Sequence, residues 1–296
     1  MKPIEIYRSM MQGVWNIGFV DNTLDEVIDG KPLKVRWLKH ECKDRWFADP
    51  FILDVTDDKI FVLVEEFYYP HKRGRLAMLT IDRASNTLLK VDTILELDSH
   101  LSFPAIIRRD GKILVYPENS KGGGLKLYEL DLEKAALVNG KTVSDVLLTD
   151  AIYTELFGKK QIYSTEDPDA NGPTLCVYEI DDSGKYSKVK EYRFPENIAR
   201  NAGDWFEYKG KIYRPAQESN VEYGHAISFQ QVEESPDGLV FKELWRKSSP
   251  HPTMKVAFHT FNMYKGMMVV DCRGYRYKVL AGIINFFRRP FVKGLS

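Results

Sequence analysis

The sequence predicts an all-β fold, a five-bladed β-propeller built from four-stranded blades. The first observation is a strand, a polar turn and a second strand that recur five times along the 296 residues. The turns are spaced by roughly 50 residues, which is in the range of propeller blades. The second observation is that two further alternating segments follow most of these hairpins.

The clearest hairpin covers residues 100–119, where Arg-Asp-Gly-Lys at 109–112 forms the turn. Its second strand ends in Tyr-Pro-Glu-Asn, and a polar residue closes the second strand of each other unit. The remaining hairpins span residues 49–66, 150–166, 204–218 and 259–271. An open β-sandwich would not require five near-equal repeats, so the propeller is the favoured interpretation.

Third and fourth strands complete the first four units. The third strands are expected at 76–82, 125–131, 175–181 and 227–232, and the fourth at 91–97, 143–148, 189–194 and 240–245. The fifth unit shows a third strand near 275–279 and no fourth. Residues 33–41 alternate partly and can fill that vacancy, so we expect the N-terminus to close the ring. Residues 1–32 show no clear pattern and are expected to be an N-terminal extension.

Composition excludes several classes of function. Forty-two basic residues balance 42 acidic ones, so overall charge provides no argument for nucleic-acid binding. No stretch reaches the ~20 apolar residues of a transmembrane span, and the sequence opens without a secretory signal. We therefore expect a single soluble domain over residues 1–296, cytoplasmic in location. Three widely spaced cysteines are expected to be reduced thiols, not a disulfide or zinc site.

The topology predicts where the polar residues meet. The first strand of a blade crosses the molecule and the second strand returns. The start of the first strand and the end of the second strand therefore lie on the same face. Polar residues occupy those positions in all five units, which favours a ligand site at the propeller axis. They include Asp49, Glu65, Glu66, His100, Glu118, Asp150, Glu166, Arg200, Asp204, Arg214, Gln217, Glu218, His259 and Asp271.

Short motifs in this order resemble a known family. The Ala-Asp-Pro-Phe sequence at 48–51 resembles the first-blade signature of the five-bladed glycosidases of glycoside hydrolase family 43. A closer resemblance is to the N-terminal domain of plant glucosamine inositolphosphorylceramide transferases and its bacterial relatives. Further matching motifs are His-Leu-Ser-Phe-Pro at 100–104, Tyr-Pro-Glu at 116–118, Ala-Arg-Asn-Ala-Gly at 199–203, Tyr-Arg-Pro-Ala-Gln at 213–217 and His-Thr-Phe-Asn at 259–262.

The resemblance implies roles for carboxylates. Asp49 falls where the glycosidases have their general base, and Asp150 where an aspartate orients the acid and tunes its pKa. Blade four has Arg200 and Asn201 where the family pattern places the acid. Inverting hydrolysis needs one carboxylic acid and one carboxylate. The acid can then come from a neighbouring strand end, at Glu118, Asp204 or Glu218, or the chemistry has been lost.

Other residues are candidates for binding a carbohydrate ligand. Arg200 and Arg214, near Gln217, can form a fork for an anionic group, or inter-blade salt bridges to Glu118 or Asp204. His100 can bind a sugar hydroxyl, or it can have a structural role in holding the start of a blade in place. His259 resembles a histidine that faces a central calcium or water in some family 43 enzymes; no metal is the favoured prediction, and a structural calcium at the axis is the alternative. Glu66 and Tyr223 complete the binding candidates, and Trp46 and Trp205 are further stacking candidates.

Three functions remain open. The first is a glycoside hydrolase or transglycosidase, and the second is a glycan-binding or scaffold propeller that serves glycosyl transfer or polysaccharide metabolism. The third is a protein-interaction propeller, which a charged centre argues against. The tail at 280–296 mixes large apolar residues with cations. It is expected to dock on the protein, with contact to a membrane surface as the alternative.

Overall fold

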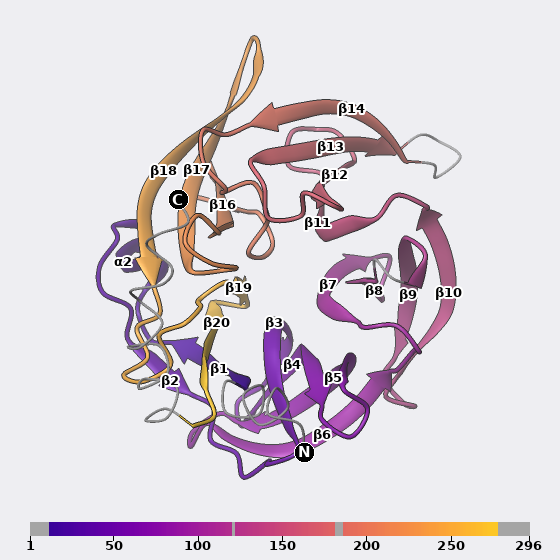
Figure 1. Ribbon diagram of the computed structural model, residues 1–296, viewed down its shortest axis with the longest axis vertical. Helices are drawn as coiled ribbons and strands as arrows, with labels where there is room; N and C mark the ends of the chain where they lie inside the picture. Colours follow the sequence, from indigo (N-terminus) through magenta and orange to yellow (C-terminus); the bar gives the residue numbers. More distant parts are fainter. Residues whose placement is uncertain (1–11, 120–121, 181–185, 278–296) are drawn as a thin grey trace, which may run out of the picture.

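The computed structural model describes residues 12–119, 122–180 and 186–277. Five four-stranded antiparallel sheets stand in a ring around a central axis (Figure 1). The predicted five-bladed β-propeller is therefore confirmed. Each sheet presents its first strand to the axis and its fourth to the outside, so the first strands position whatever lies at the centre.

Four blades are formed by strands that follow one another along the chain. Blade one consists of β3 (Arg45–Val55), β4 (Lys59–Tyr68), β5 (Arg73–Asp82) and β6 (Thr87–Leu95), and blade two of β7 (Ser102–Arg109), β8 (Lys112–Glu118), β9 (Leu125–Asp131) and β10 (Ala136–Ser144). Blade three consists of β11 (Leu148–Thr154), β12 (Gln161–Glu166), β13 (Thr174–Ile180) and β14 (Tyr186–Arg193). Blade four consists of β15 (Phe206–Tyr208), β16 (Lys211–Glu218), β17 (Ala226–Ser235) and β18 (Gly238–Ser248).

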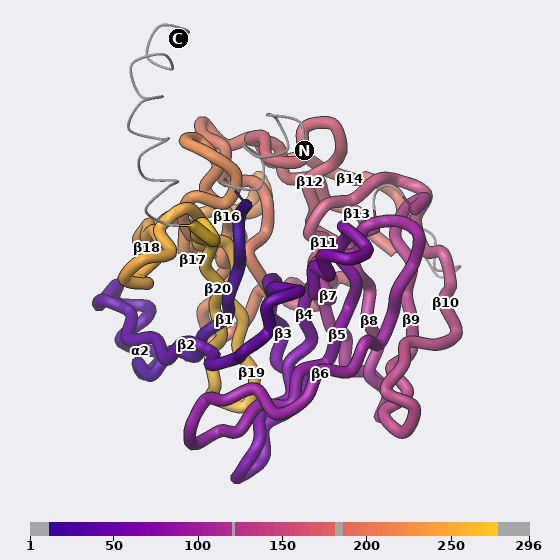
Figure 2. The backbone as a smooth tube through the Cα atoms, turned by 60° about the horizontal axis from the view of Figure 1, so that its bottom comes forward, coloured from indigo at the N-terminus to yellow at the C-terminus, as the bar shows by residue number. Residues whose placement is uncertain are grey.

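The fifth blade joins the two ends of the chain. It consists of β19 (Phe261–Tyr264), β20 (Met267–Tyr275), β1 (Gly13–Val20) and β2 (Val35–Trp37), in that order. The expected closing strand at 33–41 is present as β2. Figure 2 shows β1 beside β20, and the two strands pair antiparallel over their whole length.

The third strand of this blade differs from the expectation. Tyr275 belongs to β20, where it pairs with Gly13, and β1 takes the third position instead of residues 275–279. Residues 278–279 lie outside the described residues. Segment 13–20 is thus part of the sheet and not of an extension, because β20 needs a partner along its outer edge.

One short helix, α2 (Leu24–Ile28), connects β1 to β2. Thr23 caps it in a capping box with Glu26, which satisfies free backbone N–H groups at the helix start. The carbonyl of Val27 accepts a hydrogen bond of 2.7 Å from the indole of Trp245 in blade four. The N-terminal segment is therefore fastened to blade four as well as to blade five.

Apolar side chains pack between neighbouring blades. Phe51 of blade one meets Phe103 of blade two edge to face, with ring centroids 4.9 Å apart. Cys42, Cys176 and Cys272 are free thiols, as expected. Within the described residues no helix is long and apolar enough to cross a membrane. The tail at 280–296 lies outside those residues, so the predictions for it remain predictions.

Candidate functional site at the propeller axis

Three first strands begin with the same local distortion. Asp49, Phe103 and Asp150 have φ values of 50°, 45° and 46°, and a β-bulge follows each of them in β3, β7 and β11. Such a conformation is costly for residues other than glycine, and it persists where surrounding contacts over-determine it. Here each residue's backbone N–H donates to a carboxylate of the preceding blade: Asp49 to Asp271, Phe103 to Asp49 and Asp150 to Glu118. The bulges thereby link four blades around the axis.

Asp150, Arg200 and Glu118 form the first charged group at the axis. Arg200 Nε donates to Asp150 Oδ2 at 2.6 Å, and Arg200 Nη2 lies 3.3 Å from Glu118 Oε2. Gln217 donates to the same Asp150 oxygen at 2.5 Å, and Asn171 accepts from Arg200 at 2.9 Å. The expected inter-blade pairing of Arg200 with Glu118 is present, and Asp150 is a second partner.

Burial changes the protonation of Glu118. Loss of solvent raises the pKa of Glu118 well above its ordinary value, although Arg200 opposes the shift, and the neighbouring Asp150 carboxylate adds to it. The side chain of Glu118 keeps 16% of its surface exposed. Glu118 thus keeps its proton to a higher pH than an ordinary carboxyl, and its exposed surface is accessible to ligands at the axis.

Asp49, His259 and Asp271 form the second group. His259 Nδ1 lies 2.9 Å from Asp271 Oδ2, and its Nε2 lies 3.6 Å from Asp49 Oδ1. Thr260 donates its hydroxyl to Asp49 at 3.1 Å. Burial raises the pKa of Asp49 to about 8, against the attraction of His259. Burial alone would lower the pKa of His259, but Asp271 and Asp49 outweigh it and raise the value.

These three residues bring one potential ligand atom each within 4.8 Å of one another. The Asp271 oxygens are already used, because they accept from the backbone N–H groups of Asp49, His259 and Thr260 as well as from the imidazole. Calcium takes six to eight oxygen ligands. The group of Asp49, His259 and Asp271 does not fit calcium, because it offers one imidazole and a carboxylate that already accepts from four donors. These three residues form a hydrogen-bonded network.

The structure separates Glu65 from Glu66. His100 Nε2 lies 3.1 Å from Glu65 Oε1, and Glu65 is close enough to Asp49 to affect its pKa. Glu66 points to the opposite side of β4, where it is fully buried between Arg45 and Arg75. Successive side chains of a strand face opposite ways, so only one of the two can lie at the axis. Glu66, predicted as a binding residue, is an ion-pair residue inside blade one.

Arg214 does not join Arg200. Its fully buried guanidinium donates to the carbonyls of Ile198 and Ala199 and to the side chains of Gln230 and Asn201. Burial lowers the pKa of Arg214 to about 9. The proposed fork of two arginines is therefore not formed, and Arg214 supports the loop that carries Arg200.

The two remaining candidates for the acid also stand apart from the cluster. Asp204 is influenced by Arg108, at the far end of β7, and burial raises its pKa to about 7. Among the described residues, no hydrogen bond or ion pair joins its side chain to Asp150, Glu118 or Arg200. Glu218 is buried at the end of β16 and accepts from the backbone N–H of Asn220 at 2.8 Å.

Aromatic rings line one side of the cluster. Trp15 stacks on His259 with ring centroids 4.1 Å apart, and Tyr223 meets His259 edge on at 5.3 Å. Trp46 stacks on Phe67 and lies beside Trp15. Trp205 is instead buried against Tyr163, so it is blade packing and not a stacking platform. Sequence reasoning missed Trp15, because its strand carries no repeat motif.

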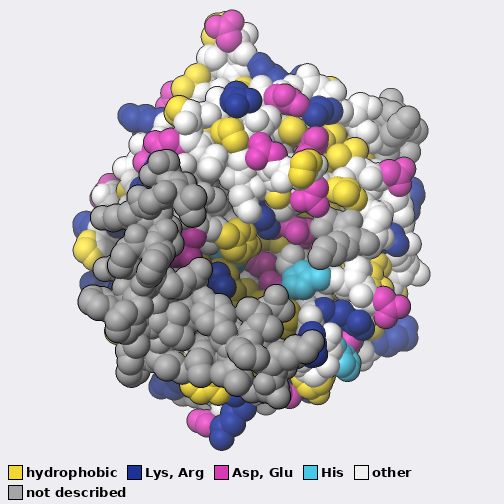
Figure 3. All heavy atoms as spheres, in the orientation of Figure 1, with side chains coloured by type: hydrophobic (Ala, Val, Ile, Leu, Met, Phe, Trp, Pro, Cys, Tyr) yellow, Lys and Arg dark blue, Asp and Glu magenta, His cyan; other side chains and the backbone are white. Residues whose placement is uncertain are grey.

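The space-filling view shows this end of the axis as a hollow with acidic, basic and histidine side chains around it (Figure 3). The residues that meet there are Asp49, Glu65, His100, Glu118, Asp150, Arg200, Gln217, Tyr223, His259, Thr260, Asp271 and Trp15. Carboxyls, one arginine, histidines and aromatic faces form a combination suited to hydroxyl-rich ligands.

The fold is a five-bladed propeller like that of glycoside hydrolase family 43 enzymes. The structure is similar to RS223 β-xylosidase (TM-score 0.52, 12% identity, 77% of this chain and 92% of that one). It is also similar to a GH43_1 enzyme from Xanthomonas citri complexed with xylose (TM-score 0.52, 12% identity, 78% and 88%). At such identities the likeness concerns the fold.

The family itself is shown by the sequence. Residues 38–246 match the model of the family described as glucosamine inositolphosphorylceramide transferase 1, N-terminal, and the chain belongs to this family. The transferase from Arabidopsis thaliana is 28% identical over 206 residues, and that from Oryza sativa subsp. japonica is 24% identical over 194. These matches cover 64% and 63% of this chain, but 26% of each relative. The chain thus spans about a quarter of the length of the curated relatives.

Proposed function

We propose that this chain is a carbohydrate-active protein that binds a glycan at the propeller axis and acts on a glycosidic bond there. The observation that carries the proposal is the state of Glu118, a partly accessible carboxyl whose pKa burial raises well above its ordinary value. Glycosidases need one carboxylic acid that is still protonated at working pH. The raised pKa of Glu118 in blade two suits it to this role, although blade four presents Arg200.

In this proposal the two groups at the axis have separate roles. Glu118 donates its proton to the glycosidic oxygen, and Asp150 and Arg200 hold Glu118 in place. Asp49 acts as the base that activates water, with His259 offsetting its charge. Because burial raises the pKa of Asp49 to about 8, this base becomes more available as the pH rises toward 8.

A second candidate is a propeller that binds a glycan without cleaving it. The observation in its favour is the pairing of Arg200 with Asp150, at 2.6 Å, because Arg200 occupies the position from which the glycosidase family supplies its acid. Such a domain would serve glycosyl transfer, the activity that the names of the curated relatives describe. Trp15, Trp46 and Tyr223 would then supply contact area for sugar rings.

The test compares wild type with Glu118→Gln and Asp49→Asn on a panel of glycans and chromogenic glycosides. Product release and binding by calorimetry are both measured. Glutamine has the shape of Glu118 but carries no acidic proton, so we expect at least a hundredfold loss of turnover with binding retained. Asp204→Asn is the matched control, since Asp204 stands apart from the cluster.

The outcomes separate the two candidates. Release by wild type and by Asp204→Asn, but not by the other two variants, supports catalysis by Glu118 and Asp49. Binding by all four proteins without any product supports the second candidate. Absence of both binding and product for every glycan would contradict a carbohydrate site at this axis.

A further inference from the structure

A second cavity opens on the opposite face of the propeller, at the turns between strands. It has a volume of about 630 Å³ and lies between blades one, two and five. This volume falls within the ~300–1,000 Å³ of typical small-molecule sites. The carbohydrate proposal makes no use of this cavity, since Asp49 and Glu118 stand at the other ends of the same strands.

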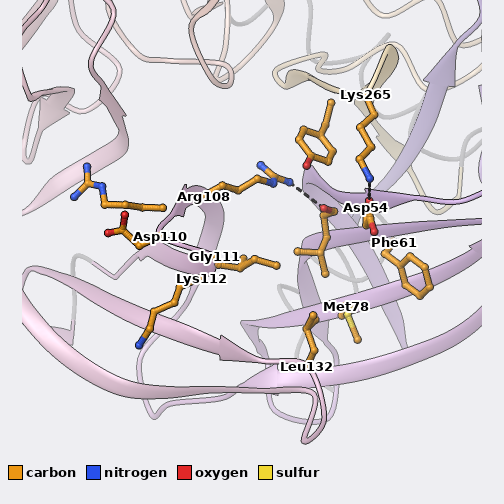
Figure 4. A pocket seen from close by; sticks show the side chains of 13 residues that line it. Asp54, Phe61, Met78, Arg108, Asp110, Gly111, Lys112, Leu132 and Lys265 are labelled. Carbon is orange, nitrogen blue, oxygen red and sulfur yellow. Dashed lines mark hydrogen bonds and ion pairs between the residues drawn. The ribbon is translucent and has the colours of Figure 1, made fainter.

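The cavity wall is largely apolar. Leu53 and Met78 are buried at its base, and Phe61 and Ile113 contribute half-buried side chains. Leu132 stands at the edge with 56% of its surface exposed. Figure 4 shows Met78 and Leu132 among the side chains that line the cavity. A ligand would therefore bury an apolar portion against these side chains.

One cation is held in place at the charged end. Arg108 donates from its Nη2 to the carbonyls of Ile52 and Leu53 at 2.8 and 2.9 Å, and its guanidinium lies 3.6 Å from the ring centre of Tyr264. The residue itself is exposed. Stacking and two carbonyl acceptors fix the guanidinium before any ligand arrives, which lowers the entropy cost of binding.

The guanidinium of Arg108 is held by carbonyl oxygens and not by a direct ion pair. Among the described residues no carboxylate oxygen lies within 4 Å of it, whereas the other cations of the cavity are paired: Lys265 with Asp54 at 2.6 Å, Arg109 with Glu155 at 2.7 Å and Lys112 with Glu129 at 3.0 Å. Asp110 points away from Arg108 in Figure 4. Asp54 and Asp204 both interact with the charge of Arg108, but from beyond ion-pair distance.

We propose that this cavity binds a single-chain amphiphile, with its anionic head group on Arg108 and its apolar chain along Met78 and Leu132. A guanidinium with free N–H donors recognises a phosphate or carboxylate, and the apolar wall recognises the chain. A protein partner is less suited, because a stable protein interface buries about 1,600 Å² in total. The site is independent of the glycan site at the other face.

The test titrates the chain of residues 1–296 with decyl phosphate below its micelle-forming concentration, by calorimetry. Decanol and inorganic phosphate are the matched probes, one without the charge and the other without the chain. We expect one molecule of decyl phosphate to bind per chain, at least tenfold more tightly than either probe. Equal affinity for decanol and decyl phosphate, or no binding of decyl phosphate, would overturn the proposal.

Variants locate the site. Leu132→Glu places a negative charge at the exposed edge and should weaken decyl phosphate binding at least tenfold. Leu89→Glu is the control, because Leu89 is equally exposed at 55% but lies in β6 outside the cavity. Arg108→Gln should abolish the preference for decyl phosphate over decanol. If Leu132→Glu bound decyl phosphate as tightly as wild type, the assignment of the ligand to this cavity would be contradicted. This outcome can be measured even if Arg108→Gln does not fold. Glu118→Gln should bind decyl phosphate as wild type does, which separates this test from that of the glycan site.

Discussion

Arg200 of blade four donates from Nε to Oδ2 of Asp150 in blade three at 2.6 Å, across 50 positions of sequence. The guanidinium is one-tenth exposed and the carboxylate is almost completely buried. This pair joins two blades at the axis and also fixes the charge next to Glu118. Arg200 is thus a cation that contacts two carboxyls, Asp150 and Glu118.

Removal of Arg200 should therefore strongly destabilise the fold. Arg200→Ala leaves Asp150 and Glu118 side by side without their cation, and we expect a loss of about 3–5 kcal/mol in the free energy of unfolding. Urea denaturation measures it. The control is Arg246→Ala, which breaks the exposed pair with Glu196 and should cost about 1 kcal/mol or less. Similar losses for both variants would mean that the axial pair contributes no more than a surface pair.

Asp204 should make the protein less stable as the pH rises. Burial raises its pKa from 3.8 to about 7, with Arg108 opposing, so the folded state holds a proton that the unfolded state releases. The free energy of unfolding therefore falls between about pH 4 and pH 7, and the contribution of the protonated group is lost above that range. Asp204→Asn cannot ionise, so its stability relative to wild type should rise from pH 4 to pH 8. Urea denaturation at both ends of this range measures the difference; a constant difference would contradict the raised pKa.

The N-terminal strand β1 should be necessary for stability. Ile17 is completely buried in β1, where it packs with apolar side chains of blades one and five. We expect Ile17→Ala to cost about 2–5 kcal/mol through lost burial and the cavity that remains. Val240→Ala, at an exposed position of β18, should change stability by no more than about 0.5 kcal/mol. Thermal and urea denaturation measure both losses. If the two variants lost the same free energy of unfolding, β1 would not contribute to the fold as described.

The repeat pattern was sufficient to predict the ring, since each hairpin carries its own alternation and turn. It was not sufficient for the fifth blade. Segment 13–20 pairs with the nearby β2 only at its end, and the strand that it pairs with over its whole length, β20, follows more than two hundred residues later. Local patterns do not contain pairings of such range, so residues 275–279 were a natural but wrong choice for the third strand.

The site was predictable in its location and less so in its members. Strand ends placed Asp49, Asp150, Glu118 and His259 at one face, and the structure brings them together. The choice between Glu65 and Glu66 depends on register, and the β-bulges after Ala48 and Ile52 in β3 shift it. The direction of Arg214 depends on carbonyls of the 198–199 loop, which no local pattern indicates.

The joining of chain ends in the fifth blade has a consequence for synthesis. Gln12 and Arg276, whose side chains meet there, are 264 positions apart. While the chain emerges from the ribosome, blades one to four can form in turn, but the edge of β1 that pairs with β20 stays unpaired until β20 has been made. During that interval an apolar strand edge stays available to other chains, which is the situation in which chaperones act. Pairing of β1 with β20 then closes the ring by joining a strand made early in synthesis to one made late.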